Sequence, residues 1–474
     1  MKEYNRHSDE KRRRVIGAHL TSSETFSTYI LPEIKDKLND FLWVDLYAGE
    51  GNLIFPILDL IPPEKRSLFF ADHIFLSDVR NEMVQKSIEK AIAYGISEQV
   101  AKNNIQQRNN LKTFPVFLKK RKYPVYHITN PPYLYLGYIK KHPETKHYSD
   151  YFDGQNNGYQ DLYQIAMIND LRNNIDNLIY LIPTNFLFGS SVSNKFRLDF
   201  LKYYDVEKMY IFEKQIFEFT GTNILIGFFE RKESPKLETV QFQGKKFKKN
   251  GKVIQRRYDL IPTYNYRAGS EFNEFLDQYG AKKPINVSYY LQKKEVKNNY
   301  GEHEIKVIDT SEYESNEYNI KFLKVNESLK EKVLANQLYV RTVDTGSYDG
   351  RVGLYSIQED FNVEGIFVSG NTYRTSPIQI FLSPRISKKD QVLLKRYFNL
   401  ILESFRDTLD SEFLTTYKYS NAEYTRKYLG LTQTRDLIKT FPILSIRKEE
   451  RARLKNLIDN QKPKTIIEVL QKEK

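Results

Sequence analysis

Short apolar runs alternate with segments of helical pattern through the first half of this 474-residue chain, and this alternation restricts the fold more than any other feature. Apolar runs bounded by turn residues are typical of buried strands. Helices between such strands are the crossovers that a parallel sheet requires. Strands are expected at 41–46, 69–77, 123–129, 178–183 and 224–230, with helices at 53–58, 81–94 and 160–172. We therefore expect an α/β sheet over roughly residues 20–230.

The pattern changes beyond Arg231. Short β-like segments with glycine-rich turns replace the alternation over 338–384, and one long amphipathic helix is expected at 393–409. This combination of short strands and a long helix predicts a second domain of mixed α+β structure. We place the boundary so that residues 1–235 form the first domain and residues 236–474 the second.

Positive charge is concentrated in the second half of the chain. Of 73 Lys and Arg and 60 Asp and Glu, residues 1–230 hold 29 and 28, a net +1, and residues 231–474 hold 44 and 32, a net +12. Such an excess is typical of a polyanion-binding module beside a nearly neutral one, although a solvated lysine-rich surface gives the same count. Nucleic acid is therefore one expected partner.

Cysteine is absent, and its absence excludes several classes of site. A disulfide scaffold, a Cys-ligated zinc, an iron–sulfur cluster and a cysteine nucleophile all require it. The seven histidines show no metal-ligand spacing, so no metal is expected. No apolar stretch has the length of a membrane helix, and the N-terminus lacks the apolar core of a signal peptide. We expect a cytoplasmic protein without a membrane partner.

A glycine-rich turn follows the first expected strand. Gly49 and Gly51 in the segment 45–51 allow the backbone to approach a ligand closely. Asp78 ends the next strand, where a carboxylate can accept both hydroxyls of a ribose. This spacing favours a nucleoside cofactor, and it does not by itself distinguish NAD from S-adenosylmethionine.

The tetrapeptide Asn130-Pro131-Pro132-Tyr133 follows another strand. Two consecutive prolines fix the backbone and remove two hydrogen-bond donors. The Asn130 carboxamide oxygen and the Pro131 carbonyl are a matched pair of acceptors for an exocyclic amino group. Tyr133 offers a face to a planar ring. Because ligands of open α/β sheets bind along the carboxyl ends of the strands, this segment is expected at the ligand site.

Together these segments resemble the amino-group DNA methyltransferases that use S-adenosylmethionine, in particular adenine-N6 enzymes of the gamma motif order. The resemblance covers about residues 14–230 and implies a Rossmann-like methyltransferase sheet. Asn109 stands where the family usually has an aspartate that contacts the cofactor's adenine. The cofactor-binding residues that the resemblance implies are Thr21, Asp45, Tyr47, Gly49, Gly51, Asp78, Asn109 and Asn130. The catalytic residues that it implies are Asn130, Pro131, Pro132, Tyr133 and Phe217.

The activity that the resemblance implies is transfer of a methyl group from S-adenosylmethionine to N6 of a flipped-out adenine in double-stranded DNA. It also implies a restriction–modification system with a cognate restriction endonuclease, and it makes residues 236–474 the target-recognition domain. Methylation at cytosine C5 is excluded, because that reaction needs a cysteine thiolate.

Two alternatives stay open. Methyltransferases of the same fold that act on a protein glutamine amide or on RNA share the tetrapeptide, but they usually lack a basic C-terminal extension. A DNA-binding subunit with an idle catalytic fold is the other, and the intact segment 130–133 argues against it.

Three segments of the second domain are expected to contact bases and phosphates, because they are rich in Tyr, Thr, Arg and Asn. These segments are 339–355, 370–376 and 415–428. Three acidic residues of the first domain are expected to be helix caps and surface residues, namely Asp153, Asp161 and Asp170.

Overall fold

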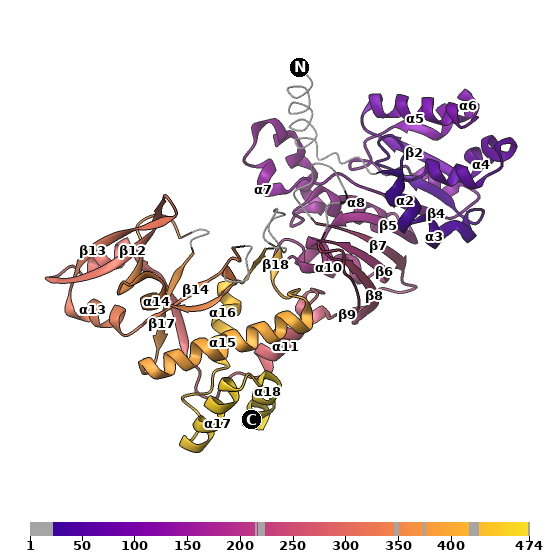
Figure 1. The fold of residues 1–474 in the computed structure, drawn as a ribbon. Coiled ribbons are helices and arrows are strands. Elements are labelled where there is room, and N and C mark those ends of the chain that lie inside the picture. The colour runs from indigo at the N-terminus through magenta and orange to yellow at the C-terminus, as the bar shows by residue number, and fades with distance from the viewer. Residues whose placement is uncertain are drawn as a thin grey trace. The chain divides into compact units, whose positions relative to one another are not determined.

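The computed structural model describes residues 22–213, 216, 223–345, 350–372, 376–416 and 426–472. The chain forms two compact units, Met1–Ala268 and Gly269–Lys474, which we call unit 1 and unit 2 (Figure 1). The expected boundary at 235–236 falls inside unit 1, because the two following strands complete its sheet. Thr21 and Phe217 lie outside the described residues.

Unit 1 is built on a nine-stranded sheet in the order β3-β2-β1-β4-β5-β7-β6-β8-β9. Strands β1 to β5 run parallel, β7 is antiparallel to β5 and β6, and β8 is parallel to β6. The strands are β1 (Leu42–Asp45), β2 (Ile74–Asp78), β3 (Ile105–Gln107), β4 (Val125–Thr129), β5 (Asn177–Pro183), β6 (Tyr204–Phe212), β7 (Ile224–Arg231), β8 (Val240–Phe247) and β9 (Val253–Leu260). The prediction of an α/β fold is confirmed.

Helices cover both faces of this sheet, because alternate strand residues point to opposite sides. Val44 joins a buried cluster with residues of α8 and α10, whereas Trp43 joins a second cluster with residues of α2, α4 and α5. The α-helices of unit 1 are α2 (Ser23–Tyr29), α3 (Leu31–Ile34), α4 (Arg66–His73), α5 (Asn81–Ala93), α6 (Glu98–Asn104), α7 (Leu136–Ile139), α8 (Leu162–Arg172), α9 (Asn185–Phe188) and α10 (Asn194–Leu201).

Two local predictions in unit 1 differ in detail from the structure. The run 69–77 was expected to be one strand, but Phe69–His73 is the end of α4 and only Ile74 onward is β2. A continuous apolar run does not reveal whether its period is that of a helix or of a strand. The helix expected at 53–58 is a 3₁₀ helix over Phe55–Leu60.

Unit 2 is a mixed α+β structure, as the sequence predicted. It holds two four-stranded sheets, β10-β17-β14-β15 and β11-β16-β12-β13, and a small β18–β19 pair. The strands are β10 (Asn286–Tyr289), β11 (Leu291–Gln292), β12 (His303–Glu314), β13 (Glu317–Val325), β14 (Leu338–Arg341), β15 (Gly353–Ser356), β16 (Gly365–Val368), β17 (Ile378–Ser383), β18 (Thr415–Thr416) and β19 (Lys427–Tyr428). The α-helices are α11 (Glu271–Gln278), α12 (Lys293–Asn298), α13 (Glu327–Leu334), α14 (Ile357–Phe361), α15 (Lys388–Leu409), α16 (Leu431–Lys439), α17 (Lys448–Asp459) and α18 (Pro463–Lys472).

The structural boundary changes the distribution of charge between the two parts. Residues 231–268 hold 11 Lys and Arg against three Asp and Glu, a net +8. They belong to unit 1, so unit 1 carries +9 and unit 2, with 33 against 29, only +4. Residues 231–268, which include the last two strands of the nine-stranded sheet, therefore hold +8 of the net +13.

None of the described helices combines the length and the hydrophobicity of a bilayer-spanning segment.

Candidate active site

The strand order of unit 1 fixes where a ligand site can form. From β1 the chain builds β2 and β3 on one side, and it then crosses to place β4 on the other side of β1. A crevice opens outside the carboxyl ends of the strands at such a switch point, and ligands of open α/β sheets bind there. Asp45, Asp78 and Thr129 are the last residues of β1, β2 and β4, so three candidate segments meet at this edge.

Asp45 is a buried carboxylate at the centre of the edge. Its Oδ1 accepts hydrogen bonds from Thr129 Oγ1 at 2.6 Å and from the Tyr47 backbone N–H at 3.0 Å. Among the described residues, no group donates to its Oδ2. Burial raises the pKa of Asp45 to about 6 despite these two hydrogen bonds. A buried carboxylate with one oxygen to spare suits a cationic ligand group.

The glycine turn brings β1 and β2 together. The Gly49 N–H donates to Asp78 Oδ2 at 2.9 Å, and the Gly51 N–H donates to the Ala48 carbonyl at 2.8 Å. Both glycines have positive φ, 53° and 73°. A Cβ on Gly51 would lie 2.3 Å from the Phe55 ring, so a side chain there would displace the ring as well as strain the backbone.

Asp78 is bound on its other side by Arg80. The Arg80 backbone N–H and Nε donate to Asp78 Oδ1 at 2.9 and 3.0 Å, and Nη2 reaches Oδ2 at 3.3 Å. The Asp78 side chain is 7% exposed and that of Arg80 is 32% exposed. A ribose that used both oxygens of Asp78 would therefore compete with the Arg80 guanidinium, which lies nearer to solvent.

The segment that contains Asn109 lies against the same strand ends. The Arg108 N–H donates to the Asp78 carbonyl at 3.0 Å, and Asn109 Nδ2 donates to the Tyr151 hydroxyl at 2.8 Å. Asn110 Nδ2 donates to the Leu46 carbonyl at 2.6 Å, and its buried Oδ1 has no hydrogen-bond partner. The Asn110 oxygen is an acceptor that the sequence analysis did not identify.

The segment 130–133 follows β4 directly. Asn130, Pro132 and Tyr133 are half-buried, whereas Pro131 is buried. The Tyr133 hydroxyl donates to Asn130 Oδ1 and to the Leu181 carbonyl of β5, the latter at 2.5 Å. These contacts attach the tetrapeptide to β4 and β5.

Asp161 supports the chain just after the tetrapeptide. It is the N-cap residue of α8, as expected, and its Oδ1 accepts from the Leu134 N–H at 2.9 Å. Burial raises the pKa of Asp161 to about 7.

A buried histidine, His127, holds the backbone just before the glycine turn, a role that no sequence pattern indicated. The Leu46 N–H donates to His127 Nε2 at 3.2 Å, so the ring proton lies on Nδ1, which donates to Asp170 Oδ2 at 2.6 Å. Tyr180 also donates to Asp170 Oδ2, at 2.6 Å. Asp170 is 1% exposed, so its predicted place at a cap or on the surface was wrong. The partners are 43 residues apart in sequence, and no local pattern reveals such a pair.

Tyr47 extends the same arrangement. Its ring stacks on His127 with centroids 6.3 Å apart, and burial raises its pKa well above the ordinary value. The structure thus brings together every described residue of the predicted site: Asp45, Tyr47, Gly49, Gly51, Asp78, Asn109 and residues 130–133.

The polar groups at this edge are chemically suited to S-adenosylmethionine. The spare oxygen of Asp45 suits an ammonium group, and Asp78 suits ribose hydroxyls. The unpartnered Asn110 Oδ1 is an acceptor for a ligand N–H or O–H group. No metal is needed for this fit, and the described part of the chain holds no cluster of three or more His, Asp or Glu side chains that could bind one.

The segments expected to contact DNA lie in unit 2, where one carboxylate joins two of them. Asp344 accepts from the Val352 N–H at 2.9 Å, from the Lys427 N–H at 3.0 Å and from Arg406 Nη2 at 2.9 Å. The third segment is close by, since the Thr342 N–H donates to Ser376 Oγ at 3.4 Å. Residues 346–349, 373–375 and 417–425 of these segments lie outside the described residues.

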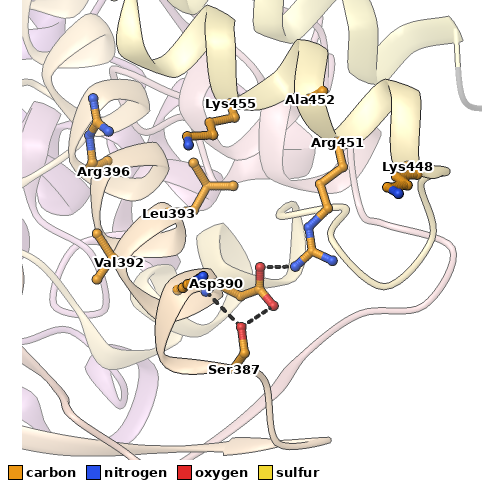
Figure 2. Close-up of a pocket in the computed structure, with 10 residues that line it drawn as sticks. Ser387, Asp390, Val392, Leu393, Arg396, Lys448, Arg451, Ala452 and Lys455 are labelled. Atoms are coloured by element: carbon orange, nitrogen blue, oxygen red, sulfur yellow. Dashed lines mark hydrogen bonds and ion pairs between the residues drawn. The ribbon is translucent and has the colours of Figure 1, made fainter.

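Unit 2 also contains a basic cleft of about 700 Å³ between α15 and α17. Figure 2 shows its lining, in which Asp390 is joined to Arg451 and to Ser387. Its cations are Lys389, Arg396, Lys448, Arg451 and Lys455.

Comparison with known proteins agrees with a methylase site in unit 1. Residues 59–217, about a third of the chain, match the model of the Eco57I restriction-modification methylase family. This region includes Asp78, Asn109, the tetrapeptide and Phe217, and it begins after the glycine turn. No curated protein matches this chain significantly.

Solved structures of restriction–modification enzymes are distantly similar. One is the Type IIL enzyme MmeI in complex with DNA, with 13% identity, a TM-score of 0.46, and 96% of this chain and 80% of that chain covered. Another is a nuclease-deletion mutant of the Type ISP enzyme LlaGI, with 10% identity, a TM-score of 0.48, and 89% and 46% covered. A protein described as a modification subunit of a type I restriction enzyme from Vibrio vulnificus YJ016 has 15% identity and a TM-score of 0.35, with 51% and 50% covered. This chain therefore spans about half the length of that protein.

Unit 1 thus has an α/β sheet with a candidate ligand site at the carboxyl ends of its strands. Residues 59–217 are, more specifically, similar to the Eco57I restriction-modification methylase family.

Proposed function

We propose that the chain is a site-specific DNA methyltransferase that transfers a methyl group from S-adenosylmethionine to N6 of a flipped-out adenine. We further propose that it is the modification enzyme of a restriction–modification system, with a cognate endonuclease as a partner. The observation that carries the proposal is the position of the segment 130–133, directly beyond β4 and beside Asp45 at the switch point of the sheet.

The tetrapeptide supplies what amino-group methylation requires. Adenine N6 is a poor nucleophile, because its lone pair delocalises into the ring. Asn130 Oδ1 and the Pro131 carbonyl would accept hydrogen bonds from its two N–H groups and raise the electron density on nitrogen. The N–CH₃ bond forms as the S–CH₃ bond of the cofactor breaks, and one N6 proton is then lost to water. Tyr133 packs against the base, and its hydroxyl holds Asn130 in place. No covalent enzyme intermediate is needed, so catalysis consists of positioning and electrostatic stabilisation.

S-adenosylmethionine, when bound, supplies an electrophilic methyl group on a sulfonium. Asp45 would bind its ammonium group, and Asp78 would bind its ribose after Arg80 moves aside. Thr21, Tyr47, Gly49, Gly51 and Asn109 complete the proposed cofactor site, and Phe217 is proposed to cover the second face of the base.

A base inside a duplex cannot reach acceptors at a sheet edge, so the target adenine must leave the helix. A 2-aminopurine at the target position should therefore brighten when the protein binds. Unchanged fluorescence in a complex that methylates normal DNA would contradict flipping.

The test of the whole proposal is methyl incorporation from labelled S-adenosylmethionine. Duplex DNA, RNA and a protein extract are offered in parallel, and modified DNA is then sequenced by a method sensitive to N6-methyladenine. Label in adenine at one short sequence is the expected result. Label in RNA or in a glutamine amide would favour the alternative substrate. No label in DNA, RNA or protein would favour a DNA-binding subunit with an idle catalytic fold.

A further inference from the structure

The hairpin of β8 and β9 carries the densest positive charge of unit 1. Residues 245–257 contain seven Lys and Arg and no Asp or Glu. They lie on the last two strands of the nine-stranded sheet, not in the unit that the sequence analysis assigned to DNA recognition.

The hairpin turn lies at the same sheet edge as the candidate active site. Strand β8 runs parallel to β6 with Phe247 opposite Phe212, and β6 runs in the same direction as β4 and β5. Four strand spacings separate β8 from β4, which is roughly 19 Å at about 4.8 Å per strand. The turn after β8 is closed by a hydrogen bond from the Gly251 N–H to the Lys248 carbonyl, with φ of Gly251 at 81°.

Part of this charge stabilises the fold, and part faces solvent. Glu213 is 5% exposed at the end of β6 and pairs with Lys246 at 3.3 Å and with Lys248 at 3.0 Å. These two lysines therefore attach the hairpin to β6. Lys245 and Lys252 are exposed, so their amines lie within reach of a ligand, and Lys249 is half-buried beside them.

We infer that the β8–β9 hairpin binds the phosphodiester backbone of the DNA substrate, on the active edge of the catalytic unit. This inference rests on the proposed function. Duplex DNA presents one charge per about 1.7 Å, so an edge about 19 Å from the tetrapeptide meets phosphates near the reacting base. Backbone contacts of this kind position the duplex without reading its sequence.

Another physical role competes with this one. In the described sheet β9 is the outermost strand, and charged side chains on an edge strand prevent pairing with another copy. Protection of the edge predicts self-association when the charges are removed, whereas a phosphate site predicts a change in salt dependence.

The test compares two triple variants of the full chain, each of which removes three charges. Lys245, Lys249 and Lys252 become Gln in the hairpin variant, and Lys389, Lys448 and Lys455 of the unit 2 cleft become Gln in the control. Binding to target and non-target duplexes is measured from low to high salt. Each lost phosphate contact reduces the log–log slope by about 0.9, so the hairpin variant should lose two to three units. The control should lose less than one, and Lys→Arg at the hairpin positions should restore the slope.

An equal loss of affinity for target and non-target duplexes in the hairpin variant supports the inference. An unchanged slope, or the same drop in the control, overturns it, and so does self-association at an unchanged slope. If the triple variant fails to fold, Lys252→Gln alone should reduce the slope by about one unit. Methyl incorporation by the wild-type chain is scored separately, so a protein that binds duplexes through the hairpin without methylating them would contradict only the proposed function.

Discussion

Each unit of the chain buries a carboxylate at or just beyond a strand end, and the two carboxylates are used differently. Asp45 of unit 1 is 1% exposed and accepts two hydrogen bonds on Oδ1, and none of the described residues donates to its Oδ2. Asp344 of unit 2 is 0% exposed and accepts from two backbone N–H groups and from Arg406. Among the described residues, only one oxygen of Asp45 accepts hydrogen bonds, whereas both oxygens of Asp344 do so.

This difference is consistent with the two proposed roles, cofactor binding by unit 1 and DNA recognition by unit 2. Binding a small cofactor requires an unsatisfied group on a rigid edge, since the ligand then contributes the missing partner. Recognition of a DNA surface would require segments whose ends are held in place. Asp344 connects the segments 339–355 and 415–428 through their backbone N–H groups. The comparison therefore predicts that removing Asp344 affects stability and target choice, whereas changes at the unit 1 edge affect the cofactor and the chemistry.

Asp344→Ala should have the largest effect. It leaves Arg406, 4% exposed, without its buried partner and leaves two backbone donors unpaired. Breaking a buried pair in this way lowers the free energy of unfolding by about 3–5 kcal/mol. Denaturant unfolding measures this loss, and mapping of methylated sites should show weaker discrimination. Glu359→Ala, which removes an exposed pair with Lys395, is the control and should change stability by about 0–1 kcal/mol. Full discrimination in the destabilised variant would show that Asp344 has no part in target choice.

Asn130→Ala should remove methyl transfer and leave the rest intact. One of two preorganised acceptors is lost, and each is worth about 3–4 kcal/mol by analogy with an oxyanion hole. The turnover number should fall by two to three orders of magnitude, while affinity for cofactor and duplex should change much less. A methyl-incorporation assay with saturating substrates measures this. Substantial residual turnover would place the chemistry elsewhere.

Asp78→Ala should weaken cofactor binding by roughly ten- to a hundredfold, since a charge-assisted acceptor contributes about 1.5–3 kcal/mol. The same change removes the acceptor of the Gly49 N–H, so Asp78→Asn is needed as the matched variant that keeps an oxygen there. Arg80→Gln should tighten binding slightly, because the guanidinium no longer competes for Asp78. Calorimetry with S-adenosylmethionine tests all three, and equal affinities for Asp78→Ala and wild type would mean that the ribose lies elsewhere.

Local patterns predicted most of the unit 1 edge. The tetrapeptide, the glycine turn and Asp78 each lie at or just beyond the end of a strand, so their position at the sheet edge could be predicted from sequence, whereas their roles stay predictions. Phe69–His73 was misassigned because one apolar run contains both the end of a helix and a strand. The His127–Asp170 pair was missed because its members meet only after β4 and α8 have packed together.

The domain boundary shows what composition cannot supply. The alternation of strand and helix patterns does end near Arg231, but two further strands, β8 and β9, extend the sheet beyond it. Whether a strand joins the preceding or the following sheet depends on long-range pairing, here between β8 and β6. Placing the boundary too early also assigned a net charge of +8 to the wrong unit.

Asp45→Asn should reduce affinity for S-adenosylmethionine least at low pH, and the reduction should grow as pH rises. An ammonium ligand binds the carboxylate form, and burial raises the pKa of Asp45 to about 6. Wild-type affinity for S-adenosylmethionine should therefore be nearly flat between pH 7 and 6.5, and it should be about tenfold lower at pH 5. The Asn variant should bind weakly with no such dependence.

The free energy of unfolding without ligand should change with pH in the opposite direction to cofactor affinity. This difference in sign makes the test specific. Because the pKa of Asp45 is higher in the folded chain than in the unfolded one, the folded chain holds this proton more tightly between pH 4 and 6. Its contribution to the free energy of unfolding without ligand therefore falls as pH rises through this window. A bound ammonium group compensates for the buried negative charge, so the cofactor should stabilise the wild type more at pH 7 than at pH 5. Asp45→Asn should remove both trends, as measured by thermal unfolding with and without cofactor at each pH. An Asn variant that kept the wild-type pH dependence of binding would assign it to another group at this edge, with Asp161 the first to examine, since its pKa is raised to about 7.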